Sequence, residues 1–435
     1  MRYFFICLII WGCSMSTVQA LQIKLESTLA NPLLLTEQKQ TTYLRVAVTG
    51  FRLQKENTSP VNVALVIDKS GSMQGQKIQQ AKAAAKIAVE RLRKDDIISI
   101  VSYDHQVDVL LPATKATDKQ MIYAAIDKIV ADGNTALYDG VQKGADELRK
   151  FLTRNQINRL VLVSDGLANV GPDTPQALGE LGAKLSQAGI SVTTIGLGLG
   201  YNEDLMTQLA KQSEGSHSFV ENATDLTRIF DHEFGDLLSV VAQEVIITIQ
   251  CAEGVRPVKI LGREANINGQ QIHIPLNQLY SEQEKYVLLE IEISPPAADQ
   301  LLTVATVTVD YRNMSTNTLD QLTSQINARF TNNRQQVKDQ TNAAVMANVV
   351  EQLAIEKNKR AVTLRDEGKV DEAKELLLEN AQQLEQGASQ YNAPSLSIMK
   401  EKNEQDADNL DEKNWNKQRK LMREEQYKRS TQQKY

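Results

Sequence analysis

Three side chains that could bind a metal stand at alternate positions in the sequence: Asp68, Ser70 and Ser72. One carboxylate and two hydroxyls are hard oxygen donors, which suit Mg²⁺ or Mn²⁺ and bind soft metals poorly. Three donors do not complete the octahedral coordination of Mg²⁺, so further oxygen ligands must come from elsewhere in the chain. Two later segments offer them, one at Thr135 and one at Asp165. Together the five residues predict a site for a divalent cation.

Apolar segments precede two of these residues in the manner of buried strands. Residues 61–67 form a β-branched run before Asp68, and residues 159–164 form a second run before Asp165. Such runs are typical of strands buried on both faces of a parallel sheet. Helices are expected over residues 77–92, after the turn that carries Ser70 and Ser72, and over residues 136–152, directly after Thr135. The oxygen donors are therefore expected at the carboxyl ends of strands, where open α/β sheets bind their ligands.

The order Asp-x-Ser-x-Ser, a Thr in a second loop and an Asp-Gly after a later strand resembles the metal-ion-dependent adhesion site of von Willebrand factor A domains. The resemblance covers roughly residues 60–240 and matches all five positions of that site. In that family the hydroxyls typically bind the ion directly, and the Asp residues often act through waters. The resemblance implies a Mg²⁺ site, with Mn²⁺ or Ca²⁺ as alternatives. Its ligands would be Asp68, Ser70, Ser72, Thr135 and Asp165.

The charge of the site suggests how it would be used. A divalent cation held by two carboxylates and three neutral hydroxyls is formally neutralised but lacks a strong ligand. An Asp or Glu carboxylate of a protein partner would complete it. We therefore expect a metal-dependent protein-binding module, for adhesion or for scaffolding a complex, rather than an enzyme. Two alternatives stay open: a structural envelope protein whose ion staples the domain, and a Mg²⁺-dependent hydrolase, for which no suitable base is evident near these loops.

Composition narrows the remaining function classes. The chain has 435 residues, 42% of them hydrophobic and 23% charged, which is typical of a globular protein with two or three domains. A net charge of −6 gives no support for nucleic-acid binding. The zinc patterns HExxH and paired CxxC and the nucleophile pattern GxSxG are missing from the sequence.

Asp139 is either a supporting carboxylate of the metal site or a carboxylate in a first helical turn.

Alternating strand and helix patterns predict the fold class. Residues 61–242 are expected to form a doubly wound, mostly parallel α/β sheet, the von Willebrand A or Rossmann-like arrangement. Strand order 3-2-1-4-5-6 would make the strands ending at Asp68 and Asp165 neighbours. Residues 21–60 and 243–314 alternate at period two and predict a flanking β-sandwich into which the α/β domain is inserted.

The C-terminal third is more polar. Residues 317–392 are expected to form a helical hairpin, either a tetratricopeptide-like unit or an appendage packed on the sandwich or on a partner. Residues 393–435 are almost wholly polar and locally basic. We expect a disordered tail, with contact to anionic lipid as the alternative.

The N-terminus predicts export. Residues 1–20 combine Arg2, an apolar run and a small-residue cleavage site after Ala20, which is typical of a signal peptide. Lipoprotein processing at Cys13 is the less favoured alternative. The expected location is the periplasm or the cell surface, and the mature chain has no apolar stretch of spanning length. Cys251 would be its main thiol and is expected to be a small core residue.

Overall fold

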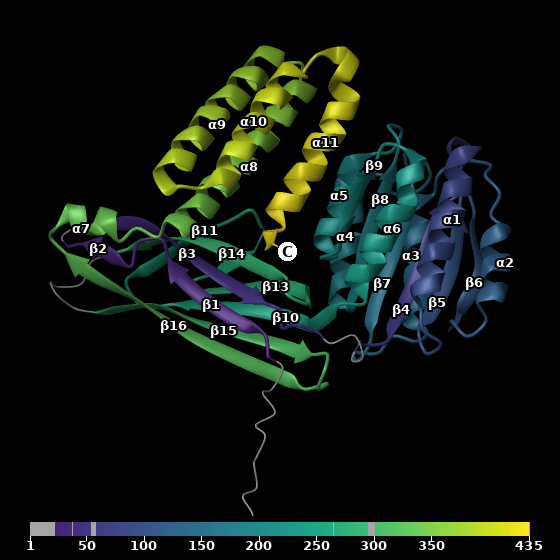
Figure 1. Ribbon diagram of the computed structural model, residues 1–435, viewed down its shortest axis with the longest axis horizontal. Helices are drawn as coiled ribbons and strands as arrows, with labels where there is room; N and C mark the ends of the chain where they lie inside the picture. The colour runs from purple at the N-terminus through teal and green to yellow at the C-terminus, as the bar shows by residue number, and fades with distance from the viewer. Residues whose placement is uncertain (1–21, 37, 54–57, 264, 295–300, 435) are drawn as a thin grey trace, which may run out of the picture.

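The computed structural model describes residues 22–36, 38–53, 58–263, 265–294 and 301–434 (Figure 1), with backbone only at 433 and 434. The predicted signal peptide, with Cys13, lies outside these residues. Three bodies are visible in Figure 1: an α/β domain, a β-sandwich and a bundle of helices. Among the described residues, no helix combines the length and the apolar character needed to cross a membrane.

The α/β domain is built on a six-stranded sheet. Its strands in spatial order are β6 (Val107–Lys115), β5 (Ile97–Tyr103), β4 (Val61–Asp68), β7 (Ile157–Ser164), β8 (Ile190–Leu197) and β9 (His217–Val220). All neighbours pair in parallel except β5 and β6, which are antiparallel. This is the predicted order 3-2-1-4-5-6, and the doubly wound fold is confirmed.

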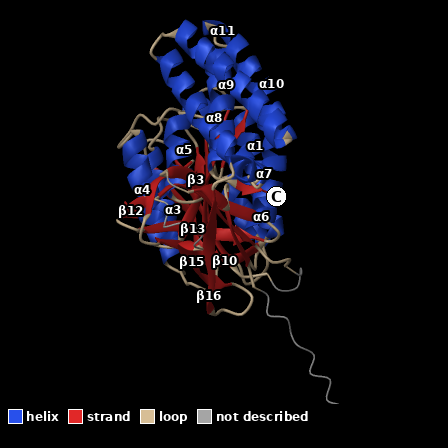
Figure 2. Ribbon diagram, turned by 90° about the vertical axis from the view of Figure 1, so that its left-hand side faces the viewer, coloured by secondary structure: helices blue, strands red, loops and turns tan. Residues whose placement is uncertain are grey.

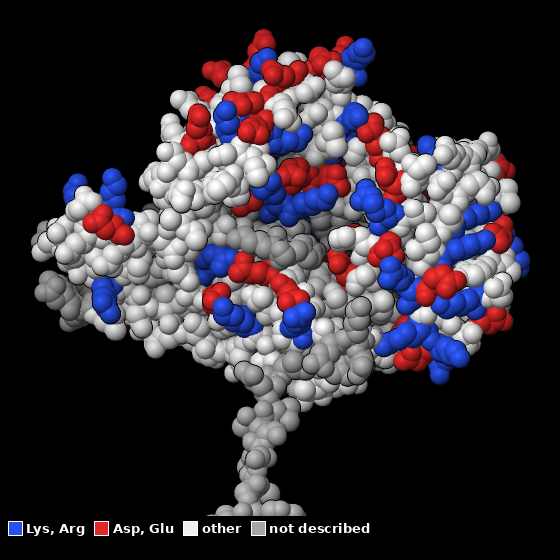
Figure 3. Space-filling model, in the orientation of Figure 1, with Lys and Arg blue, Asp and Glu red and all other residues white. Residues whose placement is uncertain are grey.

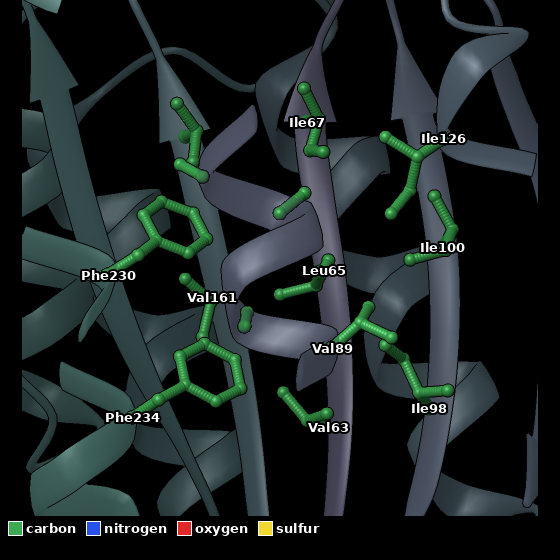
Figure 4. Packing of buried hydrophobic residues seen from close by; sticks show 14 of the residues in the cluster. Val63, Leu65, Ile67, Val89, Ile98, Ile100, Ile126, Val161, Phe230 and Phe234 are labelled. Atoms are coloured by element: carbon green, nitrogen blue, oxygen red, sulfur yellow. The ribbon is translucent and has the colours of Figure 1, made fainter. Parts of the chain in front are cut away.

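Helices cover both faces of this sheet, because successive residues of β4 point in opposite directions and are apolar on both sides. Val63, Leu65 and Ile67 face one helical layer, in which Phe230 and Phe234 stack beneath the sheet (Figure 4). That layer comprises α1 (Gln76–Arg91), α2 (Lys119–Asp127) and α6 (Leu226–Leu237). The opposite layer comprises α3 (Leu137–Arg149), α4 (Pro175–Gln187) and α5 (Glu203–Gln212).

Two sheets form the flanking sandwich and enclose a second apolar core, in which Cys251 is buried. The first contains β1 (Lys24–Leu29), β3 (Gln40–Thr49), β14 (Glu284–Ile293) and β11 (Val255–Leu261), with β17 (Gln433–Lys434) paired to β14. The second contains β12 (Asn266–Asn268), β13 (Gln271–Tyr280), β10 (Val240–Cys251), β15 (Leu302–Asn313), β16 (Leu319–Thr331) and β2 (Leu33–Leu35). Since β3 precedes the α/β domain and pairs with β14 beyond it, the domain is inserted into the sandwich.

The helical prediction for residues 317–392 is wrong at its start, where β16 is a strand of the sandwich. Its sequence is mostly polar because one face is exposed, while Ile326, Ala328 and Phe330 alternate into the core. The backbone groups on one edge of β16 form hydrogen bonds with β15 along nearly the whole strand. The helical prediction followed the change to a polar composition, because the alternation of buried and exposed residues in a mostly polar strand is a weak signal in the sequence.

The disordered tail predicted for residues 393–435 is also wrong. After the short α7 (Arg334–Asp339), four helices form the bundle that stands over the sandwich in Figure 2. They are α8 (Ala343–Asp366), α9 (Val370–Tyr391), α10 (Pro394–Asp408) and α11 (Glu412–Ser430). Much of the contact between them is polar: Asn358 donates to Asp406, and Gln426 donates to Asn358. The prediction of disorder depended on the polar composition of this segment, so it did not identify α10 and α11.

Residues 412–434, here called the C-terminal strap, join all three bodies. Lys420 is 2% exposed, and its Nζ donates to the carbonyl of Tyr201 at 2.7 Å and to the carboxylate of Glu203 at 2.5 Å. Figure 3 shows acidic and basic side chains side by side in the hollow between the bundle and the α/β domain. Further along, the strap accepts a hydrogen bond from Gln352 of α8 at the carbonyl of Arg429, and β17 pairs with β14.

We expect Lys420→Met to lower the free energy of unfolding by about 2–3 kcal/mol, since a buried carboxylate loses one of its two cationic partners. Glu203 keeps only its ion pair with Arg419. Urea unfolding followed by fluorescence of Trp415 measures the change, because this strap residue donates its indole N–H to Asp366. A chain that starts at residue 21 contains no other tryptophan.

The matched control for that variant is Lys413→Met, which removes an exposed lysine of the same helix and should change the free energy by less than about 0.5 kcal/mol. Equal stability of the two variants would show that the buried ion pair does not hold the strap.

Candidate metal centre

The structure brings the five predicted site residues together at the carboxyl edge of the α/β sheet. Asp68 is the last residue of β4, and Asp165 follows the neighbouring parallel strand β7. In Figure 4, β4 runs upward through Ile67 to this edge. Ser70 and Ser72 lie in the turn before α1, where residues 71–73 form a single 3₁₀ turn. Thr135 lies in the loop that leads into α3.

Hydrogen bonds fix the two carboxylates. The hydroxyl of Ser72 donates to Asp165 Oδ1 at 2.7 Å and lies 3.0 Å from the hydroxyl of Ser70. The backbone N–H of Ser70 donates to Asp68 Oδ1 at 2.8 Å, and the hydroxyl of Ser164 donates to Asp68 Oδ2 at 2.6 Å. The oxygen atoms that would bind the cation are therefore held in position before it binds, which lowers the entropic cost of binding.

Gly166 keeps open the space between the oxygens. A Cβ atom at this position would lie 2.8 Å from Thr135 Oγ1 and 3.5 Å from both Asp68 Oδ2 and Ser70 Oγ. Three oxygens from two separate segments, the end of β4 with the turn after it and the loop before α3, thus surround one point. This convergence, the hard-oxygen chemistry of the donors and the absence of a side chain at residue 166 fit a small divalent cation such as Mg²⁺.

Lys77 adds a charge that the sequence interpretation did not assign to the site. Its ammonium group pairs with Asp165 Oδ2 from the first turn of α1. The two carboxylates and this ammonium carry a net charge of −1. In the described part of the chain, this site included, no group of three or more His, Cys, Asp or Glu side chains is arranged to hold a metal, so an ion here would depend on hydroxyl oxygens as well as on the two carboxylates.

The sequence interpretation gave no role to Lys77 or Ser164, and it included Gly166 in the Asp-Gly motif without assigning it the role of leaving space. Ser164 and Gly166 are the immediate neighbours of Asp165, and Lys77 is the first cation after the Asp-x-Ser-x-Ser turn, so their positions carried a signal. Asp139 is exposed in the first turn of α3, which favours its interpretation as a helix-terminus carboxylate.

The pKa of the Asp68 carboxyl is raised to about 6, chiefly by burial and to a smaller extent by the nearby Asp165, against the lowering effect of the hydrogen bonds from Ser164 and Ser70. Without a cation the ionised carboxylate is therefore disfavoured. A bound divalent ion would reverse this preference, because it stabilises the charged form.

Comparison with known proteins identifies the domain. Residues 62–232 match the family model for the von Willebrand factor type A domain. This part of the chain belongs to the von Willebrand factor type A family. An uncharacterized protein of Synechocystis sp. is 28% identical over 277 residues, which are 61% of this chain and 63% of that protein. The chain thus spans less than two thirds of that relative.

Two solved structures share the fold beyond the von Willebrand factor type A (VWA) domain. A von Willebrand factor type A protein from Catenulispora acidiphila superposes with a TM-score of 0.69 at 16% identity, covering 86% of this chain and 88% of its own. The ArnB paralog VWA2 from Sulfolobus acidocaldarius gives 0.65 at 18% identity, with 94% and 98% covered. Since most of each chain is covered, the flanking sheets belong to the shared architecture.

Gly166→Ala retains all five predicted ligand residues but should weaken Mg²⁺ or Mn²⁺ binding at least ~10-fold, because the added methyl group would lie 2.8 Å from Thr135 Oγ1 and force that hydroxyl to shift. Isothermal titration with Mn²⁺ measures the affinity, and circular dichroism checks the fold. Gly235→Ala in α6, where an added Cβ atom would have no neighbour within 4 Å, is the control and should leave the affinity unchanged. Unchanged affinity in Gly166→Ala would place the ion elsewhere.

The raised pKa of Asp68 predicts a pH-dependent stability in chelator. The folded state holds this proton more tightly than the unfolded state, so the ionised carboxylate destabilises the fold above about pH 6, and the effect is lost below about pH 4. Asp68→Asn should therefore be more stable than the parent by about 1–3 kcal/mol at pH 7.5 and equal to it at pH 4. Urea unfolding at both pH values measures this, and added Mg²⁺ should reverse the order at pH 7.5.

Proposed function

We propose that this chain binds a protein partner by capturing an Asp or Glu carboxylate at a divalent cation, Mg²⁺ or one of its close substitutes. The observation that carries the proposal is the convergence of the Asp68, Ser70 and Thr135 oxygens around the space that Gly166 leaves open. When bound, the ion supplies an electrostatic anchor for one carboxylate oxygen of the partner. Membership of residues 62–232 in the VWA family supports a binding role.

Some residues of the site would bind the ion, and others fix the orientation of the two carboxylates. The hydroxyls of Ser70, Ser72 and Thr135 provide neutral oxygens, which leave charge on the ion for the partner. Asp68 is held from both sides by Ser70 and Ser164, so it cannot rotate away from the site. Asp165 is held in the same way by Ser72 and Lys77.

The proposal includes no enzymatic activity. General-base catalysis needs a carboxylate or imidazole with a free acceptor atom aimed at a substrate. Each oxygen of Asp68 and of Asp165 accepts one hydrogen bond within the site, and the proposal assigns the remaining acceptor capacity of these carboxylates to the ion rather than to a substrate. His105, in a nearby loop, lies 3.2 Å from the carboxylate of Asp104. These contacts support binding over hydrolysis.

The proposed location is outside the cytoplasm, in the periplasm or on the cell surface. The support is the sequence of residues 1–20, with cleavage after Ala20 and, as the alternative, lipid attachment at Cys13.

The test is capture of partners from an envelope extract by the immobilised protein in Mg²⁺, in chelator, and with the Asp68→Ala variant. Loss of one carboxylate ligand should weaken Mn²⁺ binding about 100-fold or more and abolish capture, with the fold retained. Asp146→Ala, which removes an exposed carboxylate at the far end of α3, is the control and should capture as the parent does.

Each outcome assigns the metal centre a different role. A partner that is retained only in Mg²⁺ supports metal-gated binding. Partners common to all samples would move recognition to the sandwich or the strap. If chelator lowers the melting temperature and releases no partner, the ion is a structural staple.

A further inference from the structure

Two exposed leucines lie on one side of the metal centre. Leu167 is 59% exposed and Leu199 is 41% exposed. Ser164 of β7 pairs with Gly196 of β8, and each leucine follows its paired residue by three positions. Because β7 and β8 are parallel neighbours, the loops that carry the leucines leave the sheet side by side.

The Leu199 loop is packed against the metal centre itself. A Cβ atom at Gly200 would lie 2.8 Å from the backbone oxygen of Asp165, and one at Gly198 would lie 3.8 Å from the Lys77 ammonium nitrogen. Leu167 follows Asp165 by two residues. The leucines therefore border the Asp165 and Lys77 side of the site.

The strap holds the Leu199 loop in place. The side-chain amide of Asn416 donates to the carbonyl of Leu199 at 3.4 Å, and Lys420 binds the carbonyl of Tyr201 two residues later. With its backbone fixed in this way, Leu199 stays at the surface. Covering exposed leucine side chains removes apolar surface from water, so a fixed pair offers a partner a sizeable apolar contact.

The charge of the site indicates which group of the partner would bind beside the two leucines. With a divalent cation, the net charge of Asp68, Asp165, Lys77 and the ion is +1, which one carboxylate neutralises. Building on the function proposed above, we propose that the partner segment presents an acidic side chain together with a bulky apolar side chain. The carboxylate would bind at the metal centre, and the apolar side chain would pack on Leu167 and Leu199.

Peptide display tests this proposal. A library of random 12-residue peptides is selected on the immobilised protein in Mg²⁺ and eluted with chelator. We expect the eluted peptides to carry Asp or Glu with Leu, Ile, Met or Phe within three positions. Against the double variant Leu167→Ser/Leu199→Ser, the acidic residue should still be selected and the apolar preference lost, and the best parental peptide should bind at least ~10-fold more weakly.

The control replaces two apolar side chains elsewhere on the surface that are more exposed than Leu167 and Leu199. Leu319→Ser/Ile398→Ser changes residues that are 70% and 63% exposed in the sandwich and the bundle, and should bind that peptide within about 2-fold of the parent. Melting temperatures verify that both double variants are folded, which exposed positions should allow.

The outcomes separate this proposal from the function on which it rests. If no peptide elutes with chelator from the parent, metal-gated carboxylate capture fails, and the apolar contact fails with it. If acidic peptides elute without an apolar preference, or bind the leucine variant as tightly as the parent, the leucines have no part in recognition and carboxylate capture stands.

Discussion

The parallel pairing of β4 with β7 is the constraint on which the rest of the molecule depends. It places Asp68 and the Ser164-Asp165 pair at the same edge of the sheet, so that Ser164 can bond one carboxylate while Ser72 bonds the other. The pairing is possible because both strands are apolar on both faces and helices cover each side. A one-residue slip in either strand would separate these side chains and turn them toward opposite faces.

Much of this could be predicted from the sequence, because it depends on local signals. The apolar run before Asp68 predicts a strand, the hydroxyls after it predict a polar turn, and the alternation of elements predicts the strand order. The oxygens at Ser70, Thr135 and Asp165 come from separate segments, and only the predicted topology unites them. The convergence of these oxygens is a structural observation, whereas the ion they would hold remains a prediction.

What the sequence did not predict depends on contacts between distant polar groups. Residues 393–434 contain few apolar residues, although Leu396, Leu410 and Met422 are buried, and composition alone indicated disorder. In the structure, Lys420 pairs with Glu203, and Gln426 bonds Asn358 within the bundle. Hydrogen-bonded polar groups of this kind are as fully buried as a hydrophobic core, but their partners cannot be identified from periodicity. The strand β16 was not predicted for the same reason, because its outward face is polar and its pairing with β15 cannot be identified from periodicity.

The insertion of the VWA domain also fixes an order of folding. The domain is continuous in sequence, so its sheet can close without help from the rest of the chain. The sandwich cannot close until β14 is synthesised, because β3 pairs with that later strand. During synthesis the strap can dock on the domain only after Lys420 is made, 217 residues after Glu203. Domains generally fold as units during synthesis, so the site-bearing domain forms before the contact that fixes its orientation.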